Sequence, residues 1–403
     1  MNKKILIITE CFYPEEFKIN DIALFWKREG YNVDVLTLNP TYPIGRVFPG
    51  YTNSFFSKDK YQGINIFRLY AVTGYKNSLT KKIARYVNFI FMGCIAAIFL
   101  GKKYDYIFGF NLGPLTHMLP AVLIRKLYRK PTMIWAQDIW PDSVYAYGFK
   151  KTKLLSFLLI KFARFVYTNI DSIAVSSKGA KSVLIPYIKS NMEIYYIPNW
   201  ADDIDMSVSP AILSNKKLIN FTFAGNVGKV QNLENIIKAF CNLPHKYQKK
   251  AQFNIIGNGS NLNNLKIIAK EKENVVFHGK KSRDNMAKYY KSSDFLVISL
   301  IDKPVFSSTT PAKLQTYIAA KRPILAVLKG DTADIVKVNN LGVLANPSHI
   351  ESIIKAVIEC INMSTTDRNN FVLNNDSLLN KNFNKIEIIK KITRILVNSK
   401  SYE

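Results

Sequence analysis

The chain has 403 residues, of which 48% are hydrophobic and 21% are charged, a composition typical of folded domains and unlike that of disordered proteins. At roughly 150 residues per domain, this length predicts two or three domains. The formal net charge of +27 predicts attraction to polyanions such as nucleic acids, anionic membranes or phosphorylated substrates. Residues 1–50 carry six basic and six acidic side chains, so the positive excess of the first half comes from residues 51–200.

The basic stretch 51–200 is also rich in large apolar residues and lacks the common signatures of nucleic-acid readers, so we expect no nucleic-acid partner. Its longest apolar run, Tyr86–Leu100, has 15 residues and basic neighbours that include Arg85. The run is shorter than the roughly 20 residues that span a bilayer, so it predicts either a buried helix or a helix at the membrane interface. The runs Ala121–Lys130 and Lys151–Tyr167 share its basic, amphipathic character, which favours docking on an anionic membrane surface.

The cysteines and the N-terminus bear on the compartment. The four cysteines are far apart and form no CxxC pair, which argues against a disulfide scaffold and against a thiolate metal site. The apolar run Ile5–Ile8 is too short for a signal peptide. We therefore expect a cytoplasmic protein that is peripheral on the inner face of the plasma membrane.

Short strand-like runs alternate with helical stretches along the chain, which is the pattern of parallel sheets covered by helices on both faces. The first strand is followed by an expected helix at Asn20–Gly30, with Asn20 or Asp21 as its cap and Gly30 just after its end. The strands expected in the first half are Lys4–Thr9, Asn32–Leu38, Ile64–Arg68, Tyr106–Phe110, Met133–Ala136, Ser172–Val175 and Glu193–Ile197. Those expected in the second half are Asn220–Ala224, Phe253–Ile256, Val275–His278, Phe295–Ile298, Ile324–Ala326 and Gly342–Leu344.

A polar segment without helical periodicity separates the two sets of strands. We therefore expect an N-terminal domain at 1–200, a linker at 201–217, a C-terminal domain at 218–384, and a last helix within 385–403 that crosses back to the first domain. The fold class is α/β, with two Rossmann-like, doubly wound domains facing across a cleft. Open α/β sheets bind ligands at the carboxyl ends of their strands, so the loops after the strands are where binding residues are expected.

Neither GxGxxG nor a P-loop follows the first strand of the chain, which weighs against a dehydrogenase or a P-loop kinase.

Two loops of the second domain have the composition of a phosphate site. The segment Gly225–Lys229 combines glycines, which let a ligand approach the backbone, with a lysine at the start of a helix, and this favours an anion. Gly257 and Gly259 form a tight turn that would let a flat ring lie against the backbone. An ordinary strand–helix turn is the alternative for both.

Lys313 is expected in the first turn of a helix that begins near Pro311. A cation at that position opposes the helix dipole by about 0.5 kcal/mol, which suggests a negatively charged ligand. A solvated lysine is the alternative.

Asp138 follows a strand of the first domain and has aromatic neighbours in Trp135–Ser143. Aromatic faces stack on sugar rings, and desolvation raises the pKa of a carboxylate. The alternative is a capping aspartate before a proline turn.

Taken together, these segments resemble the retaining glycosyltransferases of family four, which have the GT-B fold. The greatest similarity is to the bacterial subgroup that transfers N-acetyl-fucosamine-type sugars in O-antigen, capsule and colanic-acid assembly. The matching segments occur in order over nearly the whole chain: Phe12–Glu15, Pro40–Gly45, Pro49–Tyr51, Trp135–Ser143, Ile197–Trp200, Gly225–Gly228 with Gln231, Ile256–Gly259, and Pro311–Ala320 with Pro323.

The resemblance implies a UDP-sugar donor held by the C-terminal domain and a lipid-linked saccharide acceptor held by the N-terminal domain. It implies catalytic roles for Asp138, Lys229 and Lys313; Asp138 lies next to Gln137, where many relatives carry a catalytic histidine. The donor-binding residues that it implies are Gly225, Asn226, Gly228, Gly257, Gly259, Thr310, Pro311, Leu314 and Thr316. The acceptor-binding residues are Tyr13, Glu16, Tyr42, Gln137 and Trp140.

Three positions depart from the family pattern. Ser308 and Thr316 stand where many relatives have two glutamates, the second of which binds ribose. Lys321 replaces a usual glycine, at a cost of about 1 kcal/mol if the position needs a positive φ.

The resulting expectation is a retaining enzyme that moves an N-acetylated deoxyhexosamine from UDP to a polyprenyl-diphosphate-linked saccharide of a bacterial surface polysaccharide. Lysines would stabilise the leaving UDP, and no cofactor and no metal are expected. The acidic pair Asp203 and Asp205 falls in the expected linker and is not favoured as a metal site. A nucleotide-sugar epimerase with the same fold and an inactive scaffold in an assembly complex are the alternatives.

Overall fold

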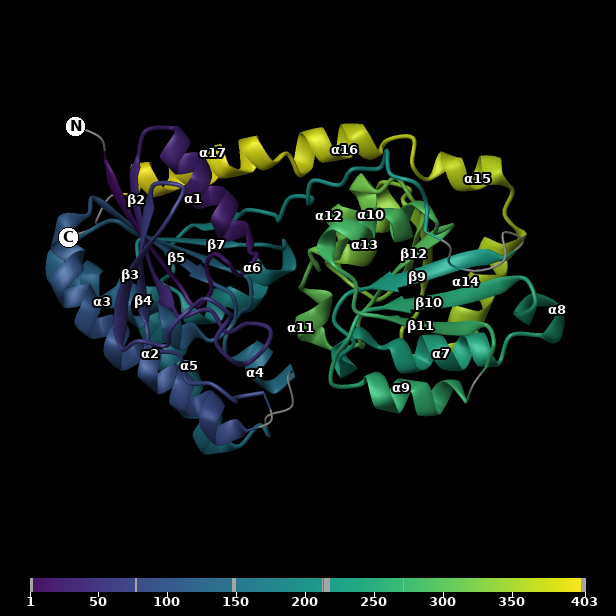
Figure 1. Cartoon of the computed structure of the whole chain (residues 1–403), viewed down its shortest axis with the longest axis horizontal. Coiled ribbons are helices and arrows are strands. Elements are labelled where there is room, and N and C mark those ends of the chain that lie inside the picture. Colours follow the sequence, from purple (N-terminus) through teal and green to yellow (C-terminus); the bar gives the residue numbers. More distant parts are fainter. Residues whose placement is uncertain are drawn as a thin grey trace. The chain divides into compact units, whose positions relative to one another are not determined.

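The computed structural model describes residues 3–76, 78–146, 150–211, 213, 218–270 and 272–399. The chain divides into two compact units, one formed by Met1–Ile197 with Ile386–Glu403 and the other by Pro198–Lys385 (Figure 1). Within the expected linker, residues 212 and 214–217 lie outside the described part of the chain.

Unit 1 is built on an eight-stranded sheet with the order β3-β4-β2-β1-β5-β6-β7-β8. All neighbouring strands are parallel except β3 and β4, which form an antiparallel hairpin at one edge. The central strands are mostly apolar and buried, as expected for strands covered on both faces. The strands are β1 (Lys4–Thr9), β2 (Asn32–Leu38), β3 (Phe56–Tyr61), β4 (Ile64–Leu69), β5 (Tyr106–Asn111), β6 (Thr132–Ala136), β7 (Ser172–Val175) and β8 (Ile194–Tyr196).

Helices cover both faces of this sheet, with α2, α3 and α5 on one side and α1 and α17 on the other (Figure 1). The last helix is tied to the first by a hydrogen bond from Trp26 Nε1 to Thr393 Oγ1 of 2.7 Å. The helical elements are α1 (Lys18–Arg28), α2 (Leu79–Leu100), η1 (Gly101–Lys103), η2 (Leu115–Met118), α3 (Leu119–Tyr128), α4 (Asp142–Ala146), α5 (Lys153–Thr168), α6 (Gly179–Leu184), η3 (Ile185–Tyr187) and α17 (Lys385–Asn398).

The start of α1 differs from the sequence prediction. The helix begins at Lys18 after the N-cap residue Phe17, so neither Asn20 nor Asp21 is its cap. The Asn20 side chain instead donates a hydrogen bond to the carbonyl oxygen of Glu15 at 2.8 Å. The predicted end is confirmed, since Gly30 follows the helix with φ +87°.

Unit 2 contains a six-stranded parallel sheet with the order β11-β10-β9-β12-β13-β14. Its strands are β9 (Ile219–Ala224), β10 (Ala251–Ile256), β11 (Val275–Gly279), β12 (Phe295–Ser299), β13 (Ile324–Val327) and β14 (Gly342–Ala345). Its helices are η4 (Lys229–Gln231), α7 (Leu233–Cys241), α8 (His245–Gln248), α9 (Leu262–Ala269), α10 (Arg283–Lys291), α11 (Pro304–Ser307), α12 (Lys313–Ala319), α13 (Asp331–Val338), α14 (Ile350–Asn362), α15 (Thr365–Asn370) and α16 (Asn375–Asn382).

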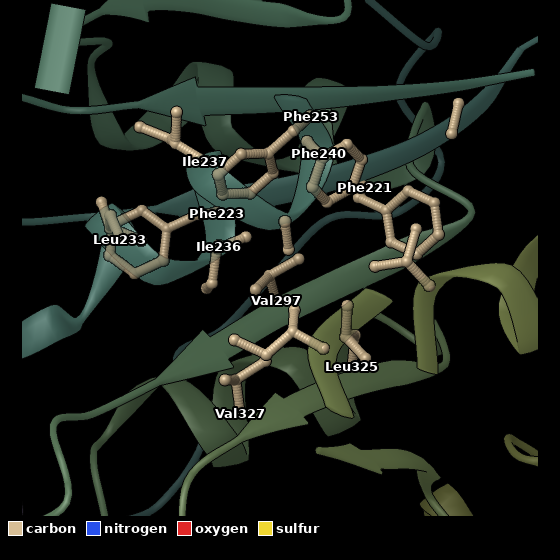
Figure 2. Close-up of a cluster of buried hydrophobic side chains, with 14 of the residues drawn as sticks. Phe221, Phe223, Leu233, Ile236, Ile237, Phe240, Phe253, Val297, Leu325 and Val327 are labelled. Carbon is tan, nitrogen blue, oxygen red and sulfur yellow. The ribbon is translucent and has the colours of Figure 1, made fainter. Parts of the chain in front are cut away.

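The core of unit 2 lies between this sheet and helices α7, α9 and α14. Phe221, Phe240 and Phe253 pack together at its centre, with ring centroids 5.3 Å and 5.1 Å apart for the two pairs that include Phe240 (Figure 2). Phe223 lies in the same cluster, near the carboxyl end of β9. This packing fixes the strand end from which the candidate site is built.

The prediction of two Rossmann-like α/β domains with parallel sheets is confirmed. Every predicted strand is present within two residues of its expected bounds. The sequence did not indicate β3, because its residues alternate between exposed and half-buried and include two lysines and an aspartate. Charged side chains of this kind are common on edge strands, where they discourage pairing with other chains.

Lys321 lies just after α12 and adopts φ +50°, so the position does require a left-handed backbone. We predict that Lys321→Gly raises the free energy of unfolding by up to about 1 kcal/mol, because glycine accepts this conformation without a steric cost. The substitution also removes the exposed ion pair between Lys321 Nζ and Asp376 Oδ2 (2.7 Å), which offsets little of the gain. Urea unfolding measures the change, with Asp376→Asn as the control for the ion pair. A loss of stability in Lys321→Gly would contradict the strain argument.

Candidate functional site

The order of the strands identifies where each sheet can bind a ligand. In unit 1 the chain moves from β1 to β2 on one side and returns to β5 on the other, and in unit 2 it moves from β9 to β10 and returns to β12. At such a reversal the loops leave in opposite directions and open a crevice at the carboxyl ends of the strands. The predicted site residues follow β1, β2 and β6 in unit 1, and β9, β10 and β12 in unit 2.

In unit 2, the loop after β9 is held by the loop after β10. Gly225 N–H donates to the carbonyl of Ile256 and Val227 N–H donates to that of Asn258, both at 2.9 Å. A Cβ atom on Gly257 would lie 1.8 Å from the Gly225 carbonyl oxygen, so only glycine permits this backbone approach. Gly257 and Gly259 therefore have a packing role that does not depend on a ligand; contact with a nucleobase stays a prediction.

The same loop presents donors to solvent. Gly225, Asn226 and Lys229 are exposed, and within the described residues the backbone N–H groups of Asn226 and Lys229 have no protein acceptor. Gly228 N–H is satisfied by Gln231 Oε1 at 3.0 Å, which fixes the turn into η4. Exposed N–H groups beside a lysine form a concave cationic surface that suits an anion.

Lys313 extends from α12 to the glycine loop. A Cβ atom built on Gly225 would lie 2.6 Å from Lys313 Cε and 2.8 Å from Nζ, so the lysine occupies the space that the missing side chain leaves. Its ammonium group lies 3.7 Å from the centroid of the Phe223 ring. Burial lowers the pKa of Lys313 to about 7. No acidic side chain contributes to this shift, so the group lacks the negative partner that would keep it charged.

The remaining donor-site predictions differ in accessibility. Pro311 is half-buried, while Thr310 is buried and its hydroxyl has no hydrogen-bond partner in the described chain. Leu314 is fully buried, so its side chain belongs to the core and is not available for a ligand. Thr316 lies one turn after Lys313 on α12, and its hydroxyl contacts Asp202 Oδ2 at 3.4 Å.

Asp202 is a residue that sequence reasoning assigned only to a linker. Its carboxylate lies between Thr316 Oγ1 and Arg283 Nη2, the latter at 3.1 Å, and the side chain is 37% exposed. Asp202 thus supplies a carboxylate next to Thr316, the position where relatives are expected to have the glutamate that binds ribose. The nearest signal in the sequence is its place just after the Ile197–Trp200 match, which does not reveal the contact with α12.

In unit 1, the loops after β1 and β2 carry three of the predicted acceptor residues. Tyr13 stacks on Tyr61 with ring centroids 3.7 Å apart, and its carbonyl accepts a hydrogen bond from buried Arg68. Tyr42 is 48% exposed and lies beside Phe17. Glu16 is exposed.

The buried neighbour Glu15 joins these two loops. Its Oε1 accepts hydrogen bonds from the backbone N–H of Thr41 at 2.9 Å and of Tyr42 at 2.6 Å. Burial raises the pKa of Glu15 to about 7, despite these two donors. The sequence prediction selected Glu16 and overlooked Glu15, whose role in holding the Tyr42 loop depends on a contact 26 residues away.

A second buried cluster lies below this surface. Arg85 Nε pairs with Glu10 Oε1 at 2.7 Å, and Arg85 Nη1 donates to Thr41 Oγ1 at 2.9 Å. His117 Nδ1 lies 3.4 Å from Glu10 Oε2, and burial lowers the pKa of His117 to about 4. Arg85, one of the basic neighbours of the apolar run Tyr86–Leu100, therefore does not face a membrane, since its side chain is 2% exposed and engaged with Glu10.

Asp138, Gln137 and Trp140 lie together after β6. Burial alone raises the pKa of Asp138 to about 6. Its Oδ2 lies 3.9 Å from where a Cβ on Gly113 would be, so the aspartate borders the loop that follows β5. Trp140 packs against the apolar cluster beneath. Because β6 pairs with β5, Asp138 lies at the carboxyl ends of these two neighbouring strands.

Within the described residues, no three His, Cys, Asp or Glu side chains lie close enough together to hold a metal ion. Asp203 and Asp205 are engaged separately, Asp203 with Lys385 at 3.5 Å and Asp205 with Ser207.

The outer side of α2 and α5 is apolar and exposed. On α2, one side packs into the core through Phe89, Met92 and Ala96, while the opposite side exposes large apolar side chains. By length and hydropathy the segment Leu79–Lys103 could cross a bilayer, but core helices of soluble proteins meet the same criterion. The exposed apolar residues of the two helices are Leu79, Ile83, Val87, Phe91, Ile95, Ile98, Phe99, Leu154, Phe157, Leu158 and Phe165.

Comparison with known proteins agrees with this architecture. Residues 208–378 match the family described as glycosyl transferases group 1. HepE of Anabaena, solved in complex with UDP and glucose, superposes with a TM-score of 0.67 over 99% of this chain and 100% of its own, at 12% identity. The fold is therefore GT-B.

Two curated relatives are also similar to this chain in sequence. The probable glycosyltransferase WbjE of Pseudomonas aeruginosa is 25% identical over 209 residues, which is 49% of this chain and about half (51%) of the relative. The putative colanic acid biosynthesis glycosyl transferase WcaI of Escherichia coli is 23% identical over 339 residues, or 78% of this chain and 81% of the relative.

Proposed function

We propose that the protein is a glycosyltransferase that takes a sugar from a nucleoside diphosphate, most simply UDP, and transfers it to a lipid-linked saccharide. The observation that carries the proposal is the contact between the Lys313 side chain and the exposed loop Gly225–Lys229. This loop lies at the carboxyl end of β9, where the strand order reverses between β10 and β12. A diphosphate there would restore the charge that burial takes from Lys313, and would accept hydrogen bonds from Asn226 and Lys229 N–H. The matches to glycosyltransferases support the class of reaction.

The proposed chemistry uses the same groups. As the bond between the sugar and the diphosphate breaks, negative charge grows on the leaving phosphate, and a preorganised ammonium group stabilises it. The acceptor hydroxyl attacks from the face that the diphosphate leaves, which retains the configuration of the sugar, and its proton passes to an oxygen of the departing diphosphate. Asp138, with its raised pKa, is the group that we assign to the acceptor side. An N-acetylated deoxyhexosamine and a polyprenyl-diphosphate-linked acceptor of a bacterial surface polysaccharide are the proposed substrates.

The test is a panel of nucleotide sugars with a lipid-linked saccharide as acceptor. Release of free UDP that depends on the acceptor supports transfer. Conversion of the UDP-sugar without an acceptor would instead indicate an epimerase, and nucleotide binding without any turnover would indicate an inactive scaffold.

Asp202 is proposed to accept hydrogen bonds from the ribose hydroxyls of the donor. Asp202→Asn is expected to weaken UDP binding about fivefold or more, because a charged acceptor strengthens such a bond by about 1 kcal/mol or more over a neutral one. The loss of affinity caused by Asp202→Asn should be smaller for 2′-deoxy-UDP, since this nucleotide lacks one of the two ribose hydroxyls that would donate to Asp202. Calorimetric titration measures both affinities. An equal loss for the two nucleotides would place Asp202 outside the ribose contact and leave it a partner of Arg283.

The exposed apolar side of α2 and α5, with lysines such as Lys153 and Lys161 along α5, is proposed to dock peripherally on the anionic inner face of the plasma membrane. Wild-type protein should float with vesicles of 30% phosphatidylglycerol at low salt. Phe157→Glu with Leu158→Glu should lower the floating fraction at least fivefold, because two carboxylates would enter the interface. Ile267→Glu, at an exposed apolar position in unit 2, is the control. Unchanged flotation of the double variant would exclude α5 from the contact.

A further inference from the structure

Between α2 and the β3–β4 hairpin of unit 1 runs a groove of 280 Å³. Phe55 and Phe56 form one wall, and Met92, Ile95 and Phe99 of α2 form the other, with three further aliphatic side chains at its base. Every lining residue is apolar. Such a lining gives no hydrogen bond to a polar ligand and gains only from burying hydrocarbon.

The groove opens onto the exposed side of α2. Phe55 and Phe99 at its rim are 70% and 72% exposed, and Ile95 continues the line of exposed residues Val87 and Phe91. Contiguous apolar surface of this kind on a charged protein marks a contact site. An α-helix is about 10 Å wide with its side chains, so a helix of a partner protein does not fit a space of 280 Å³.

The charge around the groove is positive. Residues 51–103 contain nine lysines and arginines and a single acid, Asp59; Arg68 and Arg85 are buried in ion pairs with Asp59 and Glu10, and the other seven are lysines. Lys58 lies over Phe67, whose ring stacks on Phe56 of the groove wall, and the exposed Lys102 comes two residues after Leu100, which also lines the groove. A ligand with an apolar chain and an anionic head matches this arrangement.

We propose that this groove takes one acyl chain of an anionic phospholipid, with the headgroup against Lys58 or Lys102. This inference rests on the membrane-docking part of the proposed function and adds a defined lipid site to it. Binding in the groove differs from docking on the exposed face of α2, because the groove has walls from two different elements. In the groove, a chain contacts both the hairpin and the helix; on the face, it contacts the helix alone.

The test uses vesicles of 30% phosphatidylglycerol in phosphatidylcholine that contain traces of phosphatidylglycerol with a diazirine near the end of one acyl chain. After illumination, the label should appear in two tryptic peptides of the wild type, 47–58 with Phe55 and Phe56, and 86–102 with Met92, Ile95 and Phe99. Label on 86–102 without 47–58 would overturn the groove in favour of surface contact. No label on either peptide in protein that floats would also overturn it.

Ile95→Trp and Ile83→Trp form a matched pair, because both isoleucines are exposed on α2 and only Ile95 lines the groove. Ile95→Trp should fill the groove and lower labelling of 47–58 at least fivefold, whereas Ile83→Trp should label as the wild type does. Equal labelling of the two variants would contradict the proposal. No sugar transfer is measured, so a failure here leaves the proposed reaction intact, and a protein without transferase activity can still show the lipid site.

Discussion

Replacing Lys313 by alanine is expected to lower kcat/KM for sugar transfer by about 10²–10³-fold, the range found when one preorganised donor to developing negative charge is removed. The lysine is the half-buried cation at the glycine loop, and no carboxylate competes for it. Because its amine lies over Phe223 and fills space next to Gly225, a shorter side chain removes this ammonium group from the loop and leaves only the exposed Lys229 there, while the core beneath is unchanged. The fold should therefore survive, which circular dichroism checks.

Lys303→Ala is the matched control for Lys313→Ala, since Lys303 is exposed at the start of α11 in the same segment. Its kcat/KM should stay within twofold of wild type. If Lys313→Ala also stayed within threefold, Lys313 would have no part in the reaction.

The lowered pKa of Lys313 adds a pH signature. In the free protein the amine loses its proton near pH 7, and a bound diphosphate should restore it. UDP is ionised above this pH, so the change in affinity reports on Lys313. Because Lys313 must take up a proton when UDP binds, the affinity for UDP should fall by up to tenfold per pH unit between pH 7 and 9. Lys313→Met should bind weakly with no such slope.

Arg85→Met is expected to have the largest effect on stability, a loss of about 3–5 kcal/mol in the free energy of unfolding. The change leaves the Glu10 carboxylate buried without the guanidinium that holds it at 2.7 Å. Burial alone would raise the pKa of Glu10, but His117 and Arg85 outweigh it and hold that pKa below its usual value. Chemical unfolding at pH 7 measures the loss, and Lys81→Met, at an exposed position near the start of α2, should change stability by less than about 0.5 kcal/mol.

The pH dependence of the Arg85 effect has a definite sign. In the wild type, the lowered pKa of Glu10 gives stability that is present above the unfolded value near 4.5 and is lost as the pH falls through the folded value. In Arg85→Met the pKa of Glu10 should rise above 4.5, so the variant's deficit should narrow as the pH falls from 7 toward 4.5. Adding Glu10→Gln should recover part of the loss at pH 7. A double variant as unstable as the single one would show that the ion pair is not the cause.

Those parts of the fold and site that depend on local patterns could be predicted from the sequence. Continuous apolar runs such as Lys4–Thr9 identify buried strands, and Gly225 and Lys313 lie in short segments whose composition alone suggests a phosphate contact. The structure then places Lys313 against Gly225, although 88 residues separate them in the sequence. The roles of both residues in binding stay predictions.

The residues that the sequence did not reveal depend on long-range contacts. Arg85 is one charge beside an apolar run, and only the fold shows that it turns inward to Glu10. Asp202 looks like part of a polar connection until α12 lies next to it. Strand β3 has no apolar periodicity, because it lies at the edge of the sheet and needs little burial.

The most direct measurement of the central claim is calorimetric titration of the protein with UDP, UMP and uridine at pH 7. A cationic loop that holds a diphosphate predicts that UDP binds at least tenfold more tightly than UMP, that uridine binds weakest, and that Lys313→Ala removes most of the difference between the three. Equal affinities for UDP and uridine, or a preference for UDP that survives in Lys313→Ala, would contradict it.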